Sequence, residues 1–112
     1  MRRDRLMDDL LALSEHAQAQ LAAALSDRFQ FKKILGRGGD FGDLAGFEFN
    51  AERCGGFLYF WSDGSCEFHL VDYVRSVEVI PFTRRMIATV AEVDEILGKL
   101  GQTALHLVAP SA

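Results

Sequence analysis

The side chains in this chain that could do chemistry gather in one short stretch, which contains Ser62, Ser65, His69 and Asp72. Nucleophilic catalysis requires a serine within hydrogen-bond reach of a base, and a third group that orients that base. Under the strand pairing predicted below, His69 and Asp72 point to opposite faces of a sheet. These residues therefore cannot form a catalytic line, and we expect no enzyme activity.

Metal and phosphate sites are not predicted either. Cys54 and Cys66 are twelve positions apart and the three histidines are scattered, so no pair has the spacing of a zinc site. The segment 36–46, GRGGDFGDLAG, is rich in glycine like the phosphate loop of protein kinases. Its glycine spacing differs by one residue, however, and no lysine-bearing strand follows. We interpret it as a long hairpin loop and expect no cofactor.

The element that positions these residues is a predicted β-hairpin over 55–73, GGFLYFWSDGSCEFHLVDY, with its turn at Asp63-Gly64. Asp-Gly between alternating apolar runs favours a two-residue type I′ turn, which pairs Trp61 with Cys66. One face then carries Phe57, Tyr59, Trp61, Cys66, Phe68 and Leu70, and we predict that it is the core face. The other face carries Leu58, Phe60, Ser62, Ser65, Glu67, His69 and Val71.

The two cysteines are predicted to be free. In this register Cys66 points to the aromatic core face and Cys54 to the opposite one, so the pair cannot meet disulfide geometry. Free, buried thiols are typical of a reducing compartment. Acidic residues interrupt the arginine-containing N-terminus, which argues against a signal peptide, and the apolar runs are too short to span a membrane. We therefore expect a cytoplasmic protein.

The remaining periodicities predict one α+β domain over residues 1–112. Leucine and alanine recur every three or four residues between Arg3 and Ser26, which predicts an amphipathic helix. We expect an antiparallel four- to five-stranded sheet with this helix and a C-terminal helix packed on one face.

The other elements follow from local signals. Besides the hairpin, strands are predicted over residues 29–35, 46–53 and 76–82. The last lies at an edge because Pro81 lacks an N–H, and it continues beyond a bulge. Thr89 and Glu92 form a capping box for the C-terminal helix, which Gly101 is expected to end. The tail beyond Gly101 is predicted either to form a short strand or to pack along the helix.

The net charge of −4 is unevenly distributed, because residues 40–72 hold seven carboxylates and one arginine. Phosphate repulsion makes such a surface unsuited to nucleic acid, whereas a basic protein would complement it. The same charges also provide solubility and discourage pairing at a sheet edge. The partner-binding residues that we predict are Asp40, Asp43, Glu48, Glu52, Leu58, Phe60, Glu67 and His69.

Residues 44–100 resemble the small bacterial immunity proteins of polymorphic and contact-dependent growth-inhibition toxin systems, in particular the TriTu type. That family joins an N-terminal helix to an aromatic strand ending in W-x-S/D-G. A strand with a cysteine and an acidic end follows, and then a helix introduced by a Ser/Thr-x-x-Glu box. The matching residues here are Trp61, Gly64, Cys66, Asp72, Thr89 and Glu92.

The resemblance implies a non-catalytic, cytoplasmic antitoxin that acts as a monomer. It would bind one toxin domain, often a basic nuclease encoded next to it, in a 1:1 complex that occludes the toxin active site. No cofactor, nucleic acid or membrane is implied. Two alternatives stay open. One is a small acidic chaperone for a secreted effector, which would be a homodimer. The other is a small-ligand-binding domain with a cleft between sheet and helix.

Overall fold

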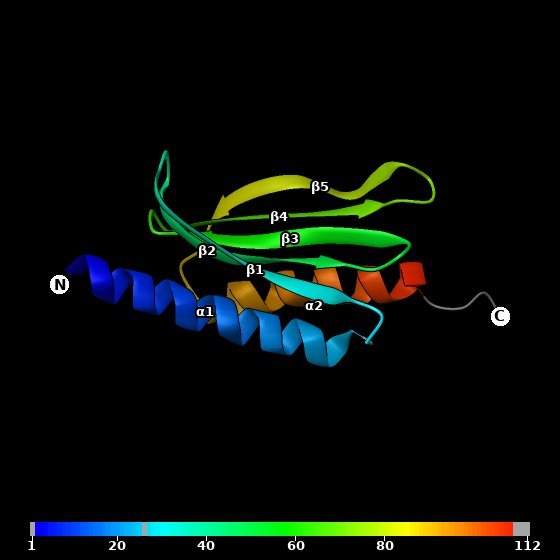
Figure 1. Cartoon of the computed structure of the whole chain (residues 1–112), viewed down its shortest axis with the longest axis horizontal. Coiled ribbons are helices and arrows are strands. Elements are labelled where there is room, and N and C mark those ends of the chain that lie inside the picture. Colours follow the sequence, from blue (N-terminus) through cyan, green and yellow to red (C-terminus); the bar gives the residue numbers. More distant parts are fainter. Residues whose placement is uncertain (1, 26, 109–112) are drawn as a thin grey trace.

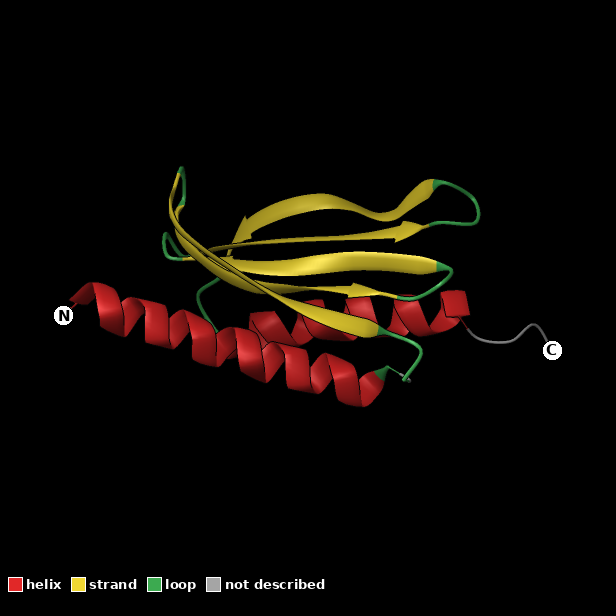
Figure 2. Ribbon diagram, viewed as in Figure 1, coloured by secondary structure: helices red, strands yellow, loops and turns green. Residues whose placement is uncertain are grey.

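The computed structural model describes residues 2–25 and 27–108, with side chains described from residue 9 onward. The chain order is α1 (Arg2–Ala24), β1 (Gln30–Gly39), β2 (Gly42–Asn50), β3 (Cys54–Trp61), β4 (Ser65–Asp72), β5 (Val77–Met86) and α2 (Val90–Val108). The five strands form one antiparallel sheet in sequence order, β1-β2-β3-β4-β5. Both helices lie on the same side of this sheet (Figure 1). The predicted α+β class is therefore confirmed, and Figure 2 shows its two layers.

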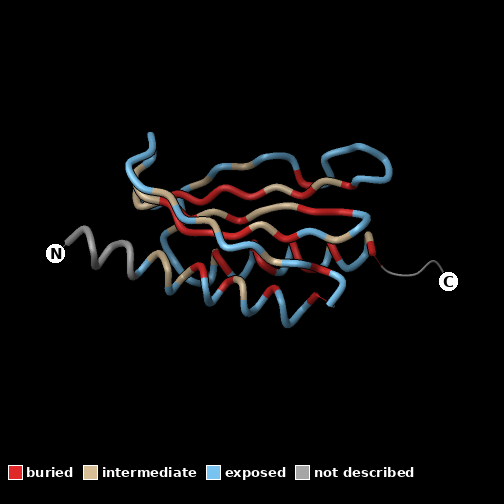
Figure 3. Tube along the Cα trace, in the orientation of Figure 1, coloured by how far each residue is buried: buried red, intermediate tan, exposed pale blue. Residues whose placement is uncertain are grey.

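The core lies between the sheet and the helix pair, as the buried segments in Figure 3 show. Along β2, Phe47 and Phe49 are fully buried, whereas Glu48 between them points away from the helices. The helices close the core with residues at helical spacing, which are Ala17, Leu21 and Leu25 of α1 and its following turn and Val93, Ile96, Leu97, Leu100 and Ala104 of α2. The core is therefore formed between every second residue of the strands and the apolar stripe of each helix, which repeats about every 3.6 residues.

The β3–β4 hairpin exists as predicted, but its predicted register is wrong by one residue. Phe60 pairs with Cys66, and the connection Ser62–Gly64 has three residues instead of two. Gly64 has a φ of 94°, whereas Asp63 does not adopt positive φ. Such a three-residue loop with a glycine in the left-handed region is the common alternative to the type I′ turn.

The slip exchanges the two faces of β3, because successive side chains point to opposite sides of a sheet. Leu58 and Phe60, which we predicted on the exposed face, are buried in the core. Phe57, Tyr59 and Trp61, which we predicted in the core, are only half-buried and lie on the side away from the helices. The residues of β4 keep their predicted faces.

Cys54 and Cys66 are free and buried, as predicted, but the predicted reason is wrong. Both point to the core face, where Cys54 pairs with Asp72 and Cys66 with Phe60. The two pairs are six positions apart along β3, a distance of about 20 Å in an extended strand. Burial raises the pKa of each thiol to about 11.

The predicted glycine-rich loop is mostly strand. β1 extends to Gly39 and β2 begins at Gly42, so the connection is a tip of only Asp40 and Phe41. Gly42 has a φ of 97°, and a Cβ atom there would collide with the Ser62 hydroxyl. The glycine content is therefore explained by a tight turn that passes close to the β3–β4 loop.

The prediction that Gly101 ends the second helix is wrong. α2 continues through it to Val108, so the segment after Gly101 is neither a strand nor a tail packed along the helix but part of the helix, as far as the described residues go. A Cβ atom at Gly101 would lie 3.5 Å from Leu21 Cδ1 and 3.7 Å from Ala24 Cβ of α1. The glycine therefore lies where the two helices approach each other.

Both ends of α2 are capped. Thr89 Oγ1 accepts the Glu92 N–H at 3.3 Å, and Glu92 Oε1 accepts the Ala88 N–H at 3.1 Å, which confirms the predicted capping box. The Ala88 N–H hydrogen bond is the main reason that the pKa of Glu92 is lowered; burial opposes the shift, and hydrogen bonds from Arg85 and Thr89 add to it. At the other end, Arg28 donates to the Val108 carbonyl at 2.6 Å.

β5 is an edge strand, as Pro81 predicts, and it continues to Met86. Its pairing with β4 is irregular in two places between Phe68 and Val71, which is consistent with the predicted bulge. Neither described helix is sufficiently long and apolar to cross a membrane.

Candidate functional site

The side of the sheet turned away from the helices is covered by no other described element (Figure 1), and we call it the open face. Strand register and ring contacts place on it Lys32 of β1, Leu44, Glu48 and Asn50 of β2, Phe57, Tyr59 and Trp61 of β3, Glu67, His69 and Val71 of β4, and Glu78, Phe82, Arg84 and Met86 of β5. A solvated antiparallel face normally carries mainly polar side chains. This one carries a continuous set of aromatic side chains with carboxylates beside them.

Phe57, Tyr59 and Trp61 form an aromatic row along the middle strand. The Phe57 and Tyr59 rings are stacked with centroids 4.3 Å apart. Phe57 also lies 5.6 Å from the His69 ring and 6.0 Å from the Phe82 ring. Uncovered aromatic side chains of this density are typical of protein interaction surfaces.

One end of the row is held by the two hairpin tips. The Phe41 ring meets Trp61 edge-on at 5.6 Å, and the Arg84 guanidinium lies 3.7 Å from the Phe41 ring centre. Arg84 also pairs with Asp63 at 2.5 Å. Burial would raise the pKa of Asp63, but hydrogen bonds from Ser65 and the Arg84 charge lower it below its usual value. This end is therefore fixed by contacts within the chain.

Carboxylates flank the aromatic row on both sides. Trp61 Nε1 donates to Glu67 Oε1 at 2.8 Å, and the Tyr59 hydroxyl donates to Glu48 Oε2 at 3.4 Å. Burial, followed by the charge and hydrogen bond of Glu48 and the charge of Glu67, raises the pKa of Tyr59 to about 12. Both aromatic polar groups therefore act as donors to carboxylates, and the tyrosine remains protonated at neutral pH.

The other end of the open face contains a hollow of about 240 Å³, which has Glu48, Asn50, Phe57, His69 and Tyr73 among its lining residues. The Tyr73 hydroxyl donates to Asn50 Oδ1. This pair passes directly over Gly55, where a Cβ atom would collide with both side chains. Burial raises the pKa of Tyr73, and the nearby Cys54 and Glu48 add to the shift.

The structure brings three of the predicted partner-binding residues together, since Glu48, Glu67 and His69 share the open face. Asp40 is exposed at the β1–β2 tip. Asp43, in the same hairpin, accepts the Gly38 N–H through its side chain at 3.1 Å.

The other three predicted partner-binding residues do not lie beside Glu48, Glu67 and His69. Glu52 is exposed in the β2–β3 connection, at the opposite end of β2 from Asp40. Leu58 and Phe60 are 0% and 1% exposed, so they cannot contact a partner of the folded domain. Our prediction placed them outside because it paired the hairpin one residue out of register.

The same one-residue difference in register places the aromatic row on the open face, whereas it was predicted in the core. A signal for the correct register was present, because Tyr59 and Trp61 carry polar groups that require partners when buried. The open face supplies those partners in Glu48 and Glu67, whereas the core face does not.

The nucleophilic and metal-binding side chains lie as follows. His69 points to the open face and Asp72 to the core face, as predicted. The Ser65 hydroxyl donates to Asp63 Oδ1 at 2.5 Å and lies four residues along β4 from His69. Within the described residues, no group of three or more histidine, cysteine or acidic side chains could hold a metal ion.

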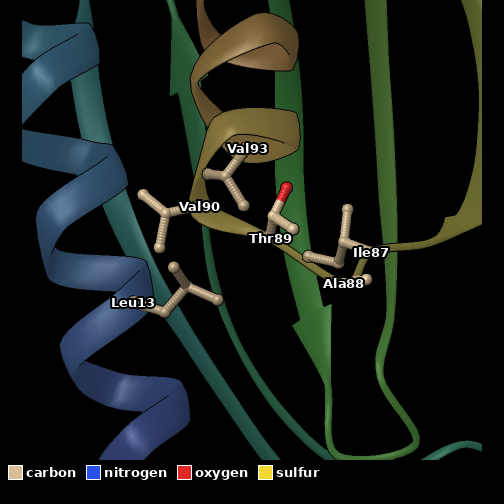
Figure 4. Close-up of a pocket in the computed structure, with 6 residues that line it drawn as sticks. All are labelled: Leu13, Ile87, Ala88, Thr89, Val90 and Val93. Carbon is tan, nitrogen blue, oxygen red and sulfur yellow. The ribbon is translucent and has the colours of Figure 1, made fainter.

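A second hollow, of about 190 Å³, lies on the helix side between α1 and the start of α2 (Figure 4). Leu13, Ile87, Val90 and Val93 line it with apolar groups. Its polar side chain is Thr89, whose hydroxyl is used by the capping box. No strand residue is among the described lining residues, so this hollow is not the predicted cleft between sheet and helix, and its lining offers few groups that could orient a small ligand.

Comparison of this chain with known proteins identifies no relative. No protein-family model, no curated protein and no solved structure matches the chain.

Proposed function

We propose that this chain is an immunity protein, a non-catalytic domain that neutralises one cognate toxin by binding it through the open face. The observation that carries the proposal is the aromatic row Phe57, Tyr59 and Trp61, which the helices leave uncovered. Aromatic side chains contribute most of the binding energy in many interfaces because they bury large areas with few rotatable bonds. The resemblance of residues 44–100 to immunity proteins supports the class of partner.

The charges around the row favour a basic partner. Glu48 and Glu78 border it with carboxylates, and Glu67 lies beneath Trp61. The Arg84 charge is already matched by Asp63. Negative potential beside an aromatic surface speeds association with a positive surface and disfavours acidic competitors. Toxin nucleases, which must hold phosphates, present such positive surfaces.

The proposed mechanism is steric and electrostatic. The sheet is a rigid platform because its other side is packed on both helices, so little order is lost when a partner binds. A toxin domain seated on the open face would have its basic surface covered, and its substrate would be excluded. No bond is made or broken in this mechanism.

The proposal is tested by co-expression with the product of the neighbouring gene. We expect a monomer that forms a 1:1 complex with that product and protects cells from it. A chain that is dimeric alone, and that keeps an effector soluble without neutralising it, would instead support the chaperone alternative.

A matched pair of variants tests the surface. Phe82 on the open face and Leu105 on α2 are both large, apolar and exposed, at 54% and 39%. We expect Phe82→Ala to weaken the complex about tenfold or more and Leu105→Ala to leave it nearly unchanged. Equal effects would show that the open face is not the docking surface.

A further inference from the structure

The hollow beside Phe57 and Tyr73 has the chemistry of a side-chain pocket. Its volume of about 240 Å³ is below the roughly 300 Å³ at which small-molecule sites begin. It opens on the open face at the end away from the Phe41–Arg84 contact, and its floor includes the glycines Gly55 and Gly56. It therefore offers room for one side chain of a partner rather than for a metabolite.

The polar groups that line this hollow are mainly acceptors. Glu48 contributes a carboxylate whose contact with the Tyr59 hydroxyl is long, at 3.4 Å. The Tyr73 hydroxyl donates its hydrogen to Asn50 Oδ1. The Tyr73 hydroxyl oxygen and Asn50 Oδ1 therefore each keep lone pairs that can accept a further hydrogen bond. No lysine or arginine is among the described lining residues.

His69 adds a buried nitrogen that has no partner. Its Nδ1 atom makes no hydrogen bond, and Glu78 Oε1 is 3.8 Å away, beyond hydrogen-bond distance. This atom is buried and lies on the side of Glu78, which does not line the hollow. The side-chain groups that can meet a donor in the hollow are therefore those of Glu48, Asn50 and Tyr73.

The walls of the hollow are aromatic. The Phe57 and His69 rings are stacked with their centroids 5.6 Å apart, and the Tyr73 ring is also among the lining groups. A flat cation stacks on such faces, and a carboxylate at the rim fixes its orientation. Guanidinium is the protein group that combines a plane, five donors and a permanent charge, whereas an ammonium group is a compact and more strongly hydrated charge.

We propose that the hollow receives an arginine side chain of the partner, with the guanidinium stacked on Phe57 and bound by the Glu48 carboxylate. This inference rests on the proposed function, because it names the residue type that the open face recognises. Lys32 of β1 stands opposite Glu48 in register, so its ammonium group would compete with an incoming guanidinium for the carboxylate.

The inference is tested without the partner by titrating the full-length protein with N-acetylarginine amide while recording backbone amide resonances. We expect saturable shifts at Gly55, Gly56 and Tyr73, with a Kd on the order of a few millimolar. The citrulline analogue, which has the same shape without the charge, should bind about tenfold more weakly or not at all.

Three variants sharpen the test. Glu48→Gln should weaken arginine binding about tenfold, Lys32→Gln should strengthen it by roughly twofold, and Glu52→Gln should leave it unchanged. Glu52→Gln is the control because it removes one negative charge, as Glu48→Gln does, but from the exposed β2–β3 connection. Equal binding of arginine and citrulline, or shifts confined to other strands, would overturn the inference.

The two proposals fail separately. If the arginine probe does not bind, but the chain still forms a neutralising complex that Phe82→Ala weakens, the pocket is wrong and the function stands. If the probe binds and no neutralised partner exists, the function is wrong while the guanidinium site stands.

Discussion

Trp61 Nε1 donates a hydrogen bond of 2.8 Å to Glu67 Oε1 across the open face. Glu67 is only 7% exposed, although it lies on the side of the sheet without helices. The indole ring therefore both covers the carboxylate and supplies its hydrogen bond. This contact joins β3 to β4 beside their turn, in the register that the three-residue loop sets.

The first prediction concerns this contact. Trp61→Phe keeps an aromatic ring but leaves the buried Glu67 carboxylate without its donor, so we expect a loss of about 1–3 kcal/mol in the free energy of unfolding. Urea denaturation of the single variants and of the Trp61→Phe/Glu67→Gln double variant would give the coupling energy. Additive losses in the double variant would show that the two side chains do not interact.

The second prediction tests the turn. Gly64 has a φ of 94°, and a Cβ atom there would lie 3.2 Å from Met86 Cε. Gly64→Ala should therefore destabilise the protein by about 1 kcal/mol or more. Gly98 of α2 is the matched control, because a Cβ atom there meets nothing and its φ is not positive. Gly98→Ala should stabilise by about 0.5–1 kcal/mol. A Gly64→Ala variant that is as stable as the unchanged protein, or more stable, would contradict the three-residue loop.

The third prediction concerns pH. The pKa of Asp63 is lowered in the folded protein, so its contribution to stability is present above the unfolded-state pKa of about 4. That contribution is lost as the pH falls through the folded-state pKa, because protonation breaks the pair with Arg84. Asp63→Asn should thus lower the melting temperature at pH 7 and have little effect near pH 2. Asp94→Asn, at an exposed position of α2, is the control. A change in melting temperature that is the same at both pH values for Asp63→Asn would argue against this linkage.

The fourth prediction concerns the thiols. Cys54 and Cys66 are buried, and burial raises the pKa of each to about 11, so almost no thiolate is present at pH 8. A disulfide reagent should label neither cysteine in the native protein and both after denaturation. Rapid labelling of the native protein would mean that the core between sheet and helices opens readily.

The sequence was sufficient for the features that one local signal determines. The first helix, the Thr89–Glu92 capping box and the edge position that Pro81 indicates were predicted correctly; α1 ends at Ala24, and Ser26, the predicted end, lies outside the described residues. Each depends on neighbours in the chain, so no distant contact could change the outcome.

The sequence was insufficient where local signals favoured two arrangements of the chain about equally. Both faces of β3 are apolar, so alternation could not decide whether Phe57, Tyr59 and Trp61 or Leu58 and Phe60 pack on the helices. The length of the Ser62–Gly64 loop decides which set is buried, because its third residue shifts the pairing of β3 with β4 by one position. Gly101 was misinterpreted for a similar reason, because only the approach of α1 explains a glycine inside α2.

The central claim is that the open face binds a basic partner, and a pair of charge reversals tests it most directly. Glu48→Lys/Glu78→Lys changes the charge on the open face, and Asp94→Lys/Glu95→Lys makes the same change on exposed α2. Stopped-flow association with the toxin at low salt should be about tenfold or more slower for the first variant and nearly unchanged for the second. Equal association rates for the two variants would contradict the claim.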